Sequence, residues 1–317
     1  MMNTILMLIL SILLSAGLVW ALIPILTRMK FGQPIREEGN KDHYKKQGTP
    51  TMGGIAFLLA FFLVSIISIK FDLSLFYILI TTFAFGAIGF IDDYEKIAKK
   101  ENEGLNEKQK LVLQISVSLI LTVLMYFTLN VRIYEIDIPF ISRAFNIGIL
   151  AIPLIVFIMV GTTNAVNITD GLDGLLSSVS IPVFIGIFII ALPFNISVAL
   201  SALVFAGVLL GFLIFNSNPA SIFMGDTGSM AIGGAIVAMM IIINKPLYLI
   251  FIGGVYMMET LSVIIQRIYF KSTGGKRIFK MSPIHHHFEL EGHKETKIVA
   301  SFMVLSIILT LFTMYII

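Results

Sequence analysis

Ten long runs of apolar residues limit the folds open to this chain more than any other feature of its sequence. A helix that crosses a bilayer needs about 20 mostly apolar residues, with a range of roughly 17–25. Lipid cannot satisfy backbone hydrogen bonds, whereas a helix satisfies its own, so we expect each run to be helical. The predicted spans are Thr4–Leu26, Thr51–Ile69, Leu73–Ile91, Leu111–Leu129, Ile147–Val166, Leu175–Leu192, Ile196–Phe215, Ser229–Ile243, Leu247–Ile265 and Ile298–Ile317.

The composition agrees with a chain embedded in a membrane. Of the 317 residues, 57% are apolar and only 13% are charged, and the mean hydropathy is +0.95. Soluble domains carry about 25% charged residues. We therefore predict an all-α polytopic membrane protein in which residues 1–317 form a single integral membrane domain. The chain contains no cysteine, which excludes disulfides, thiolate metal sites and a cysteine nucleophile.

The basic residues are concentrated after odd-numbered spans. The connections that follow spans 1, 3 and 9 hold 6, 5 and 7 of the 22 Lys and Arg residues. Because positively charged loops stay in the cytoplasm, these connections are predicted to be cytoplasmic and both termini extracytoplasmic. The segment 130–146 then lies outside, and its alternating VRIYEIDIPF pattern predicts a short hairpin.

The first unusual polar motif ends the third span. Asp92 and Asp93 are adjacent, and Lys96 and Lys100 follow at helical spacing. Carboxylate oxygens are hard ligands suited to Mg²⁺, which proteins often hold together with a substrate phosphate. Lysines can contact the phosphate oxygens. The same pattern also fits a charged helix end in which Asp and Lys pair with each other.

A polar island, TTNAVNITDGLDGL, covers residues 162–175. Its Asn164, Asn167, Asp170 and Asp173 recur every three residues, and Gly171 would allow close approach of a ligand to the backbone. Carboxylates at a bilayer edge are costly and usually mark a functional site. Helix capping can account for one or two of the four residues. We therefore interpret the island as part of a binding site.

Asp226 lies in FMGDTGS, just before the eighth span. A helix N-terminus favours anions, and the carboxylate itself can bind a metal; helix capping is the alternative interpretation. If the three acidic motifs converge, they form a site at the cytoplasmic face.

Two further polar features belong to the ninth span and the connection after it. The run His285–His287 cannot turn all three rings to one ion from a regular helix, so we favour phosphate binding over a three-His zinc site. Glu259 is an acid within the span, and we favour a structural hydrogen bond for it over catalysis. Gln266, at the cytoplasmic edge, is a candidate pocket residue.

Together these motifs resemble those of the phospho-N-acetylmuramoyl-pentapeptide transferases, a branch of the polyprenyl-phosphate N-acetylhexosamine-1-phosphate transferases. TPTMGG and HHHFEL narrow the resemblance to the muramoyl-pentapeptide branch, and ten spans with both termini outside also match it. The matching stretches are KKQGTPTMGG, GFIDDYEK, TTNAVNITDGLDGL, NSNPASIFMGDTGS and PIHHHFEL.

The resemblance implies a Mg²⁺-dependent transfer at the cytoplasmic face of the bacterial plasma membrane. UDP-N-acetylmuramoyl-pentapeptide and undecaprenyl phosphate would give lipid I and UMP, the first membrane step of peptidoglycan synthesis. A soluble nucleotide sugar and a lipid phosphate must meet at the interface, and their negative charges need a metal ion and lysines. We favour direct attack of the lipid phosphate over an intermediate on an aspartate.

The resemblance also suggests roles for individual residues. Asp226 would hold Mg²⁺, Asp92 would deprotonate or position the lipid phosphate, and Asp93 would support either function. The predicted phosphate contacts are Lys46, Lys96 and Lys100, and the predicted nucleoside pocket comprises Asn164, Asn167, Asp170, Gly171, Leu172 and Asp173, with Phe223 stacking on uracil. His285 and His286 would bind diphosphate or sugar, and the remaining candidate substrate contacts are Thr51, Gln266 and His287.

Two other functions compete with this interpretation. A sister enzyme would transfer N-acetylglucosamine-1-phosphate to the same lipid with the same acidic motifs. A cation-coupled transporter or flippase would need polar residues in the middle of several spans, but Glu259 is the one clear mid-span acid. A homodimer in the lipid bilayer fits the family, and we expect no nucleic-acid partner.

Overall fold

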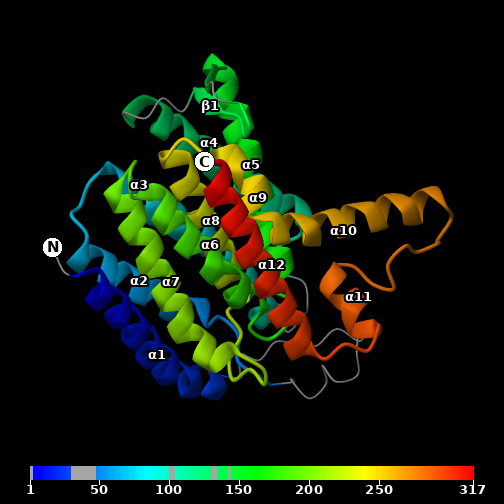
Figure 1. Ribbon diagram of the computed structural model, residues 1–317. Helices are drawn as coiled ribbons and strands as arrows, with labels where there is room; N and C mark the ends of the chain where they lie inside the picture. The colour runs from blue at the N-terminus through cyan, green and yellow to red at the C-terminus, as the bar shows by residue number, and fades with distance from the viewer. Residues whose placement is uncertain (1–2, 30–47, 100–103, 130–133, 142–143) are drawn as a thin grey trace.

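The computed structural model describes residues 3–29, 48–99, 104–129, 134–141 and 144–317, and this part of the chain is almost wholly helical. Figure 1 shows the long helices packed side by side, with a small hairpin at one end. The elements in chain order are α1 (Thr4–Arg28), α2 (Gly54–Ser68), α3 (Leu73–Lys99), α4 (Glu107–Thr128), β1 (Glu135–Asp137), β2 (Ala144–Asn146), η2 (Gly148–Leu150), α5 (Ala151–Thr169), α6 (Leu175–Ala191), α7 (Ile196–Asn216), α8 (Gly225–Ile242), η3 (Pro246–Tyr248), α9 (Leu249–Ile252), α10 (Gly254–Ser272), α11 (Ile284–Leu290) and α12 (Glu295–Ile316).

Seven helices of the described chain are long and apolar enough to cross a membrane. These are α1, α3, α4, α5 together with η2, α7, α8 and α12. The bent segment from η3 to α10 makes an eighth if it is counted as one span. Helices α2 and α6 are apolar but shorter, with 15 and 17 residues. The predicted all-α polytopic membrane protein is confirmed at this level, and the count of ten spans stays a prediction.

Helix α8 lies at the centre of the bundle. It is almost wholly buried, and its contact with α3 is the most extensive between any two described elements. Glycines on two of its faces make this possible: a Cβ at Gly234 would lie 3.0 Å from the Thr81 carbonyl oxygen of α3, and one at Gly233 would lie 2.7 Å from the Thr163 Cα of α5. Small residues let membrane helices approach closely. This packing positions the polar ends of α3, α5 and α8 beside one another.

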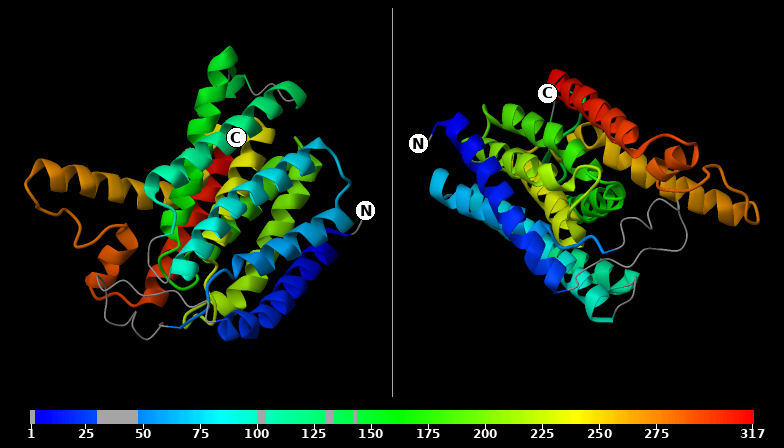
Figure 2. Two further views of the ribbon diagram at one scale, coloured as in Figure 1. Left: turned by 180° about the vertical axis from the view of Figure 1, so that it is seen from behind. Right: turned by 90° about the horizontal axis from the view of Figure 1, so that it is seen from below.

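The predicted ninth span, Leu247–Ile265, is not one continuous helix. The chain bends by 82° between Pro246–Ile252 and Gly254–Ser272, with Gly253 at the break. Sharp kinks commonly fall at small flexible residues, and Gly253 and Gly254 are adjacent here. As a result α10 projects away from the bundle, and α11 folds back toward it (Figures 1 and 2).

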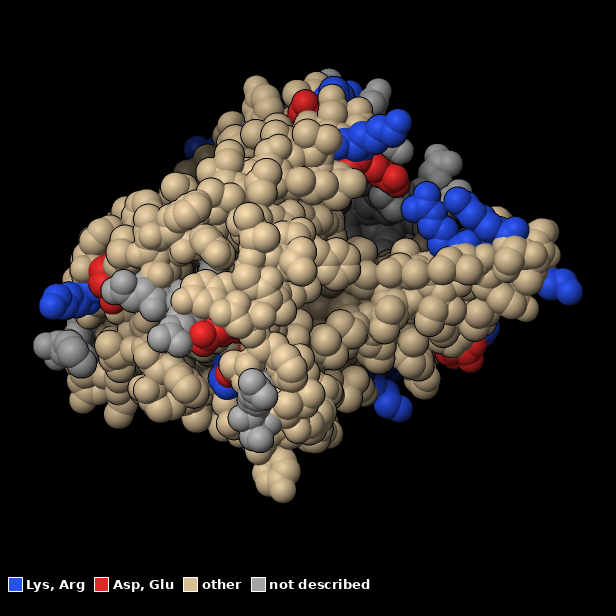
Figure 3. All heavy atoms as spheres, turned by 90° about the horizontal axis from the view of Figure 1, so that it is seen from above, with Lys and Arg blue, Asp and Glu red and all other residues tan. Residues whose placement is uncertain are grey.

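The hairpin predicted within 130–146 is confirmed. Strand β1 pairs antiparallel with β2, with Ile136 opposite Phe145. The Nζ atom of Lys245, just after α8, lies 2.6 Å from Asp137 Oδ2 and ties the hairpin to the bundle. Viewed from this end, the surface is mostly uncharged, and the largest group of Lys and Arg side chains in view lies toward the far end of α10 (Figure 3).

Candidate active site

Helices α3 and α8 bring three carboxylates together. Asp92 and Asp93 lie near the C-terminal end of α3, and Asp226 lies in the first turn of α8. One oxygen from each of the three lies within 4.8 Å of the others. Asp92 and Asp93 are buried, whereas Asp226 is partly exposed. The predicted convergence of these two acidic motifs is therefore present, and its oxygen donors are of the kind that Mg²⁺ prefers.

Two lysines bridge these carboxylates. Lys96 Nζ lies 2.6 Å from Asp92 Oδ2 and 2.9 Å from Asp226 Oδ2. Lys110 Nζ, from the start of α4, lies 2.8 Å from Asp226 Oδ2 and 3.7 Å from Asp92 Oδ2. Sequence reasoning identified Lys96 as a candidate but missed Lys110. The Asn106–Gln109 capping box fixes where α4 begins, but it does not show which lysine of α4 reaches Asp226.

Asp93 holds the N-terminus of α8. Its Oδ1 accepts a hydrogen bond from the Asp226 backbone N–H (3.0 Å), and its Oδ2 accepts from the backbone N–H and the hydroxyl of Thr227 (2.9 and 2.7 Å). Helix α8 has no side-chain cap from its own N-cap residue. The cap comes instead from α3, so the bond that completes α8 also fixes Asp226 next to Asp92.

The island is divided between a helix and a turn. Asn167, in the last turns of α5, donates from Nδ2 to Asp226 Oδ1 (2.9 Å) and to Ser229 Oγ (2.8 Å). Asn164 lies one turn earlier and faces α4, where its Nδ2 donates to Gln114 Oε1 (2.7 Å). Asn167 therefore joins the acidic cluster, and Asn164 joins α5 to α4 beside it.

The two island carboxylates have different surroundings. Asp173 is buried, and its Oδ2 accepts from Asn218 Nδ2 (3.1 Å) and the Ala220 backbone N–H (3.0 Å), which holds the segment before α8. Asp170 follows α5 beside the cluster. Burial, and then the nearby carboxylates of Asp226, Asp93 and Asp173, raise the pKa of Asp170 to about 8. Leu172, between them in the sequence, is buried.

The TPTMGG stretch packs directly on the start of α8. The Gly53 and Gly54 backbone N–H groups donate to the carbonyls of Phe223 (2.8 Å) and Met224 (3.0 Å). A Cβ at Gly54 would lie 2.5 Å from Gly228 Cα, so this close approach needs glycine. Thr51 is buried, and a Cβ at Gly225 would come within 3.0 Å of its hydroxyl. The motif thus packs against the start of α8 and hydrogen-bonds to the residues just before it. Asp93 of α3 caps the same helix end.

The His run forms part of α11 and lies close to the island. A Cβ at Gly171 would lie 2.1 Å from His285 Nε2, so the ring packs directly against that glycine. His286 Nδ1 lies 2.6 Å from Glu289 Oε2, and His287 Nδ1 accepts from the Lys280 backbone N–H (3.2 Å).

The side chain of Gln266 makes its hydrogen bonds to the backbone of residues 278 and 279 and not to the acids. Its Oε1 accepts from the backbone N–H groups of Ile278 and Phe279 (3.0 and 3.1 Å), and its Nε2 donates to the Phe279 carbonyl (2.8 Å). The side chain thus fixes the segment between α10 and α11. Lys46 and Lys100 lie outside the residues that the structure describes, so their predicted phosphate contacts stay predictions.

Comparison with known proteins identifies the family. The sequence model of glycosyl transferase family 4 matches residues 75–244, and signature 1 of the phospho-N-acetylmuramoyl-pentapeptide transferases matches residues 46–58. A protein of that name from Halalkalibacterium halodurans is 48% identical over 97% of this chain and 95% of its own length. The chain belongs to the phospho-N-acetylmuramoyl-pentapeptide transferase family. Proteins of the same name from Staphylococcus saprophyticus (49% identical, 97% of both chains) and Bacillus anthracis (47%, 96% of this chain and 95% of the relative) are similarly close.

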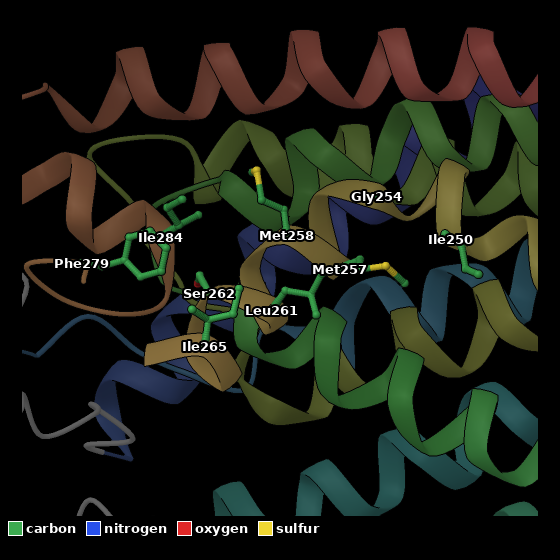
Figure 4. Close-up of a pocket in the computed structure, with 9 residues that line it drawn as sticks. All are labelled: Ile250, Gly254, Met257, Met258, Leu261, Ser262, Ile265, Phe279 and Ile284. Carbon is green, nitrogen blue, oxygen red and sulfur yellow. The ribbon is translucent and has the colours of Figure 1, made fainter. Parts of the chain in front are cut away.

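Two apolar grooves run along the surface of this transferase-family fold. One, of about 350 Å³, follows α10 and is closed at one end by Phe279 and Ile284, which turn toward Met258 and Ser262 (Figure 4). The other, of about 530 Å³, lies between α2 and α3 and reaches Thr227, whose hydroxyl donates to Asp93. None of the three acids lines this groove; Thr227 is the lining residue that is bonded to the acidic cluster.

Proposed function

We propose that this bacterial membrane protein transfers phospho-N-acetylmuramoyl-pentapeptide from UDP-N-acetylmuramoyl-pentapeptide to undecaprenyl phosphate, giving lipid I and UMP. The observation that carries the proposal is the cluster of Asp92, Asp93 and Asp226 with Lys96 and Lys110, at one end of an apolar helical bundle. Family membership over nearly the full chain supports the same reaction. It is the first membrane step of peptidoglycan synthesis.

The donor set of the cluster fits Mg²⁺. Asp226 is the ligand in this proposal, because both lysines approach its Oδ2 atom, at 2.9 and 2.8 Å. The oxygens of Asp93 accept from the α8 backbone, so Asp93 mainly positions Asp226. When bound, Mg²⁺ would neutralise the charge of the diphosphate and polarise the phosphorus that is attacked.

The chemistry follows from the two substrates. An oxygen of the lipid phosphate forms a bond to the phosphorus that bears the sugar, and the bond from that phosphorus to the oxygen bridging to UMP breaks. Asp92 accepts the proton when the lipid phosphate arrives protonated. Lys96 and Lys110 bind phosphate oxygens and offset the charge that moves to the leaving UMP. We favour this direct attack over a route through an aspartyl intermediate.

The remaining residues complete the site in this proposal. The nucleotide side is formed by the island residues and three others: Asn164, Asn167, Asp170, Gly171, Leu172, Asp173, Phe223, Thr51 and Gln266. The diphosphate or sugar is bound by His285, His286 and His287. Lys46 and Lys100 contact phosphates. The apolar groove between α2 and α3 is where we propose that the lipid chain lies, because its lining includes Thr227, which is bonded to Asp93.

The topology is part of the proposal. The seven long spans, the bent segment through α10 and the shorter α2 and α6 together give ten crossings. An even number leaves both termini on one side, which the distribution of Lys and Arg makes extracytoplasmic, with the acids facing the cytoplasm. We propose that the active unit is one integral domain per chain and that chains pair as a homodimer.

Release of UMP tests the proposal. The purified protein in detergent is given undecaprenyl phosphate and Mg²⁺ with one UDP-sugar at a time, alongside a sample in EDTA and the Asp226→Asn variant. Mg²⁺-dependent UMP release from the muramoyl-pentapeptide nucleotide alone is expected, and the variant should lose it. Release from UDP-N-acetylglucosamine instead would move the chain to the sister activity. No release from either nucleotide by folded protein would reject transferase function.

A further inference from the structure

A buried acid within the membrane bundle has an unusual partner. Glu259 lies in α10 and His285 in α11, and both residues are fully buried. The His285 Nδ1 atom lies 3.1 Å from Glu259 Oε2. The two atoms are close enough for a hydrogen bond, but the ring is not aligned for one, and within the described residues neither side chain makes a hydrogen bond. A buried carboxylate without partners is costly, so this single contact must account for the presence of Glu259.

Anchoring of α11 does not require the pair. Phe279 and Ile284 already close the apolar groove against α10 (Figure 4), and Gln266 binds the backbone of residues 278 and 279. Replacement of a buried ion pair by apolar side chains is often neutral or stabilising. The pair therefore has to be explained by what it does to the imidazole ring.

The far side of the ring faces the island. A Cβ at Gly171 would lie 2.1 Å from His285 Nε2, so this nitrogen faces the backbone of the turn that follows Asp170. A bare Nδ1 would place its lone pair 3.1 Å from a carboxylate oxygen, which is repulsive, so the proton belongs on Nδ1. Nε2 is then a bare acceptor that can rest against the Gly171 Cα–H. If Nε2 carried the proton, its N–H would be a buried donor that faces the glycine Cα and has no hydrogen-bond acceptor.

We propose that Glu259 is a positioning residue that holds His285 as the tautomer protonated at Nδ1, so that the Asp170–Gly171 turn can close against the ring. The hydrogen bond made by one imidazole nitrogen sets the state of the other, which is how a carboxylate orients histidine in other enzymes. Glu259 thereby links α10 to the nucleotide side of the site, with no contact to substrate of its own. The inference rests on the proposed function for its kinetic consequence, but the tautomer itself does not depend on that function.

Two substitutions of Glu259 separate the orienting role from simple filling of space. Glu259→Leu removes the acceptor and leaves an apolar side chain of similar size, whereas Glu259→Gln keeps an acceptor oxygen for Nδ1–H. We expect Glu259→Leu to raise KM for the UDP-muramoyl-pentapeptide about tenfold, the factor that corresponds to losing one good hydrogen bond. Glu259→Gln should rescue most of this change, and kcat should change less than KM in both. Tyr256→Phe is the matched control, because it removes a buried hydrogen bond to Ser180 one turn earlier on α10.

The tautomer is measured by ¹H–¹⁵N NMR of protein labelled with ¹⁵N-histidine, with His285→Asn assigning the signal. The wild type and Glu259→Gln should show Nδ1 protonated, and Glu259→Leu should not. An unchanged tautomer in Glu259→Leu, or a KM no higher than that of Tyr256→Phe, would overturn the inference. If the wild type releases no UMP at all, the proposed function fails, and the NMR result still decides the Glu259–His285 pair on its own.

Discussion

Lys110 shows what single side chains contribute at the acidic cluster. Its ammonium lies 2.8 Å from Asp226 Oδ2, in a region where both side chains are largely withdrawn from water. We expect Lys110→Met to lower the free energy of unfolding in EDTA by about 1.5–3 kcal/mol, the range for a hydrogen bond to a charged group. Mg²⁺ should restore more stability to the variant than to the wild type, since it replaces the missing positive charge. Thermal unfolding in detergent, with EDTA and with Mg²⁺, measures both effects.

Lys108→Met is the matched control for this substitution. Lys108 lies two residues earlier on α4, is exposed, and is the same residue type. An exposed lysine contributes little, so this variant should unfold at the wild-type temperature with and without Mg²⁺. If Lys110→Met and Lys108→Met behave alike in EDTA, Lys110 does not neutralise the cluster.

The raised pKa of Asp170 predicts a pH dependence of stability. In the folded protein this pKa is about 8, above the ordinary value of 3.8, so folding favours the protonated carboxyl. The resulting stability is complete below pH 3.8 and is lost as the pH rises through 8. In EDTA, Asp170→Asn should therefore gain stability relative to the wild type as the pH rises from about 6 to about 9. Thermal midpoints at several pH values test this, and a constant difference between the two proteins would contradict it.

At the residue scale, the sequence identified which acids form the cluster, but it did not predict the hydrogen bonds and ion pairs that each of them makes. Asp92, Asp93 and Asp226 were recognisable because carboxylates beside apolar spans are rare. That Asp93 caps α8 and that Lys110 reaches Asp226 could not be read from the sequence, because each contact joins segments more than 100 residues apart. Lys110 also looked like one of many basic residues in a cytoplasmic connection. Only the packing of α3, α4 and α8 distinguishes it from Lys108.

At the scale of elements, the contact between α3 and α8 determines the geometry of the cluster. A Cβ at Gly89 would lie 2.1 Å from the Asp226 carbonyl oxygen, which belongs to the backbone and cannot move aside cheaply. Gly89→Ala should therefore separate the two helices. We expect a loss of about 1–3 kcal/mol in stability, the usual cost of overpacking, and at least as severe a loss of UMP release. Thermal unfolding and the UMP assay measure the two effects.

Gly161→Ala provides the control on a neighbouring helix. Gly161 lies in α5, and a Cβ added to it would have no neighbour within 4 Å. Alanine should therefore be neutral there or stabilise by up to about 1 kcal/mol through its better helix propensity. If Gly89→Ala proves as harmless as Gly161→Ala, close approach of α3 to α8 is not what positions Asp226.

The helices themselves were largely predictable, because most of the apolar runs are long enough to span a bilayer and lipid leaves few alternatives. The bend at Gly253 was not. An apolar run through Leu247–Ile265 looks the same whether it continues straight or turns by 82°. A Gly–Gly pair permits the bend, but only the packing of α9 and α10 on their neighbours selects it: a Cβ at Gly254, for example, would lie 2.9 Å from the Leu309 side chain of α12.

At the scale of the whole molecule, the proposed reaction depends on which face of the membrane the acids occupy. The hairpin follows α4 and precedes α5, whereas the acids lie at the opposite ends of α3, α5 and α8. The nucleotide substrate is soluble and is supplied from the cytoplasm in this proposal. In the proposed topology, which rests on the distribution of Lys and Arg, the acid-bearing end faces the cytoplasm and the hairpin faces outward.

Because the chain has no cysteine, single introduced thiols can test this orientation without background labelling. Ala144→Cys in β2 and Ser272→Cys at the end of α10 are conservative changes at exposed positions. A membrane-impermeant maleimide should label Ala144→Cys on intact cells, and should label Ser272→Cys only after the membrane is permeabilised. The reverse pattern would turn the acidic cluster to the outer face, where a cytoplasmic nucleotide could not reach it. Labelling of both thiols on intact cells would mean that the hairpin and the end of α10 share one side, and the ten-span topology would be wrong.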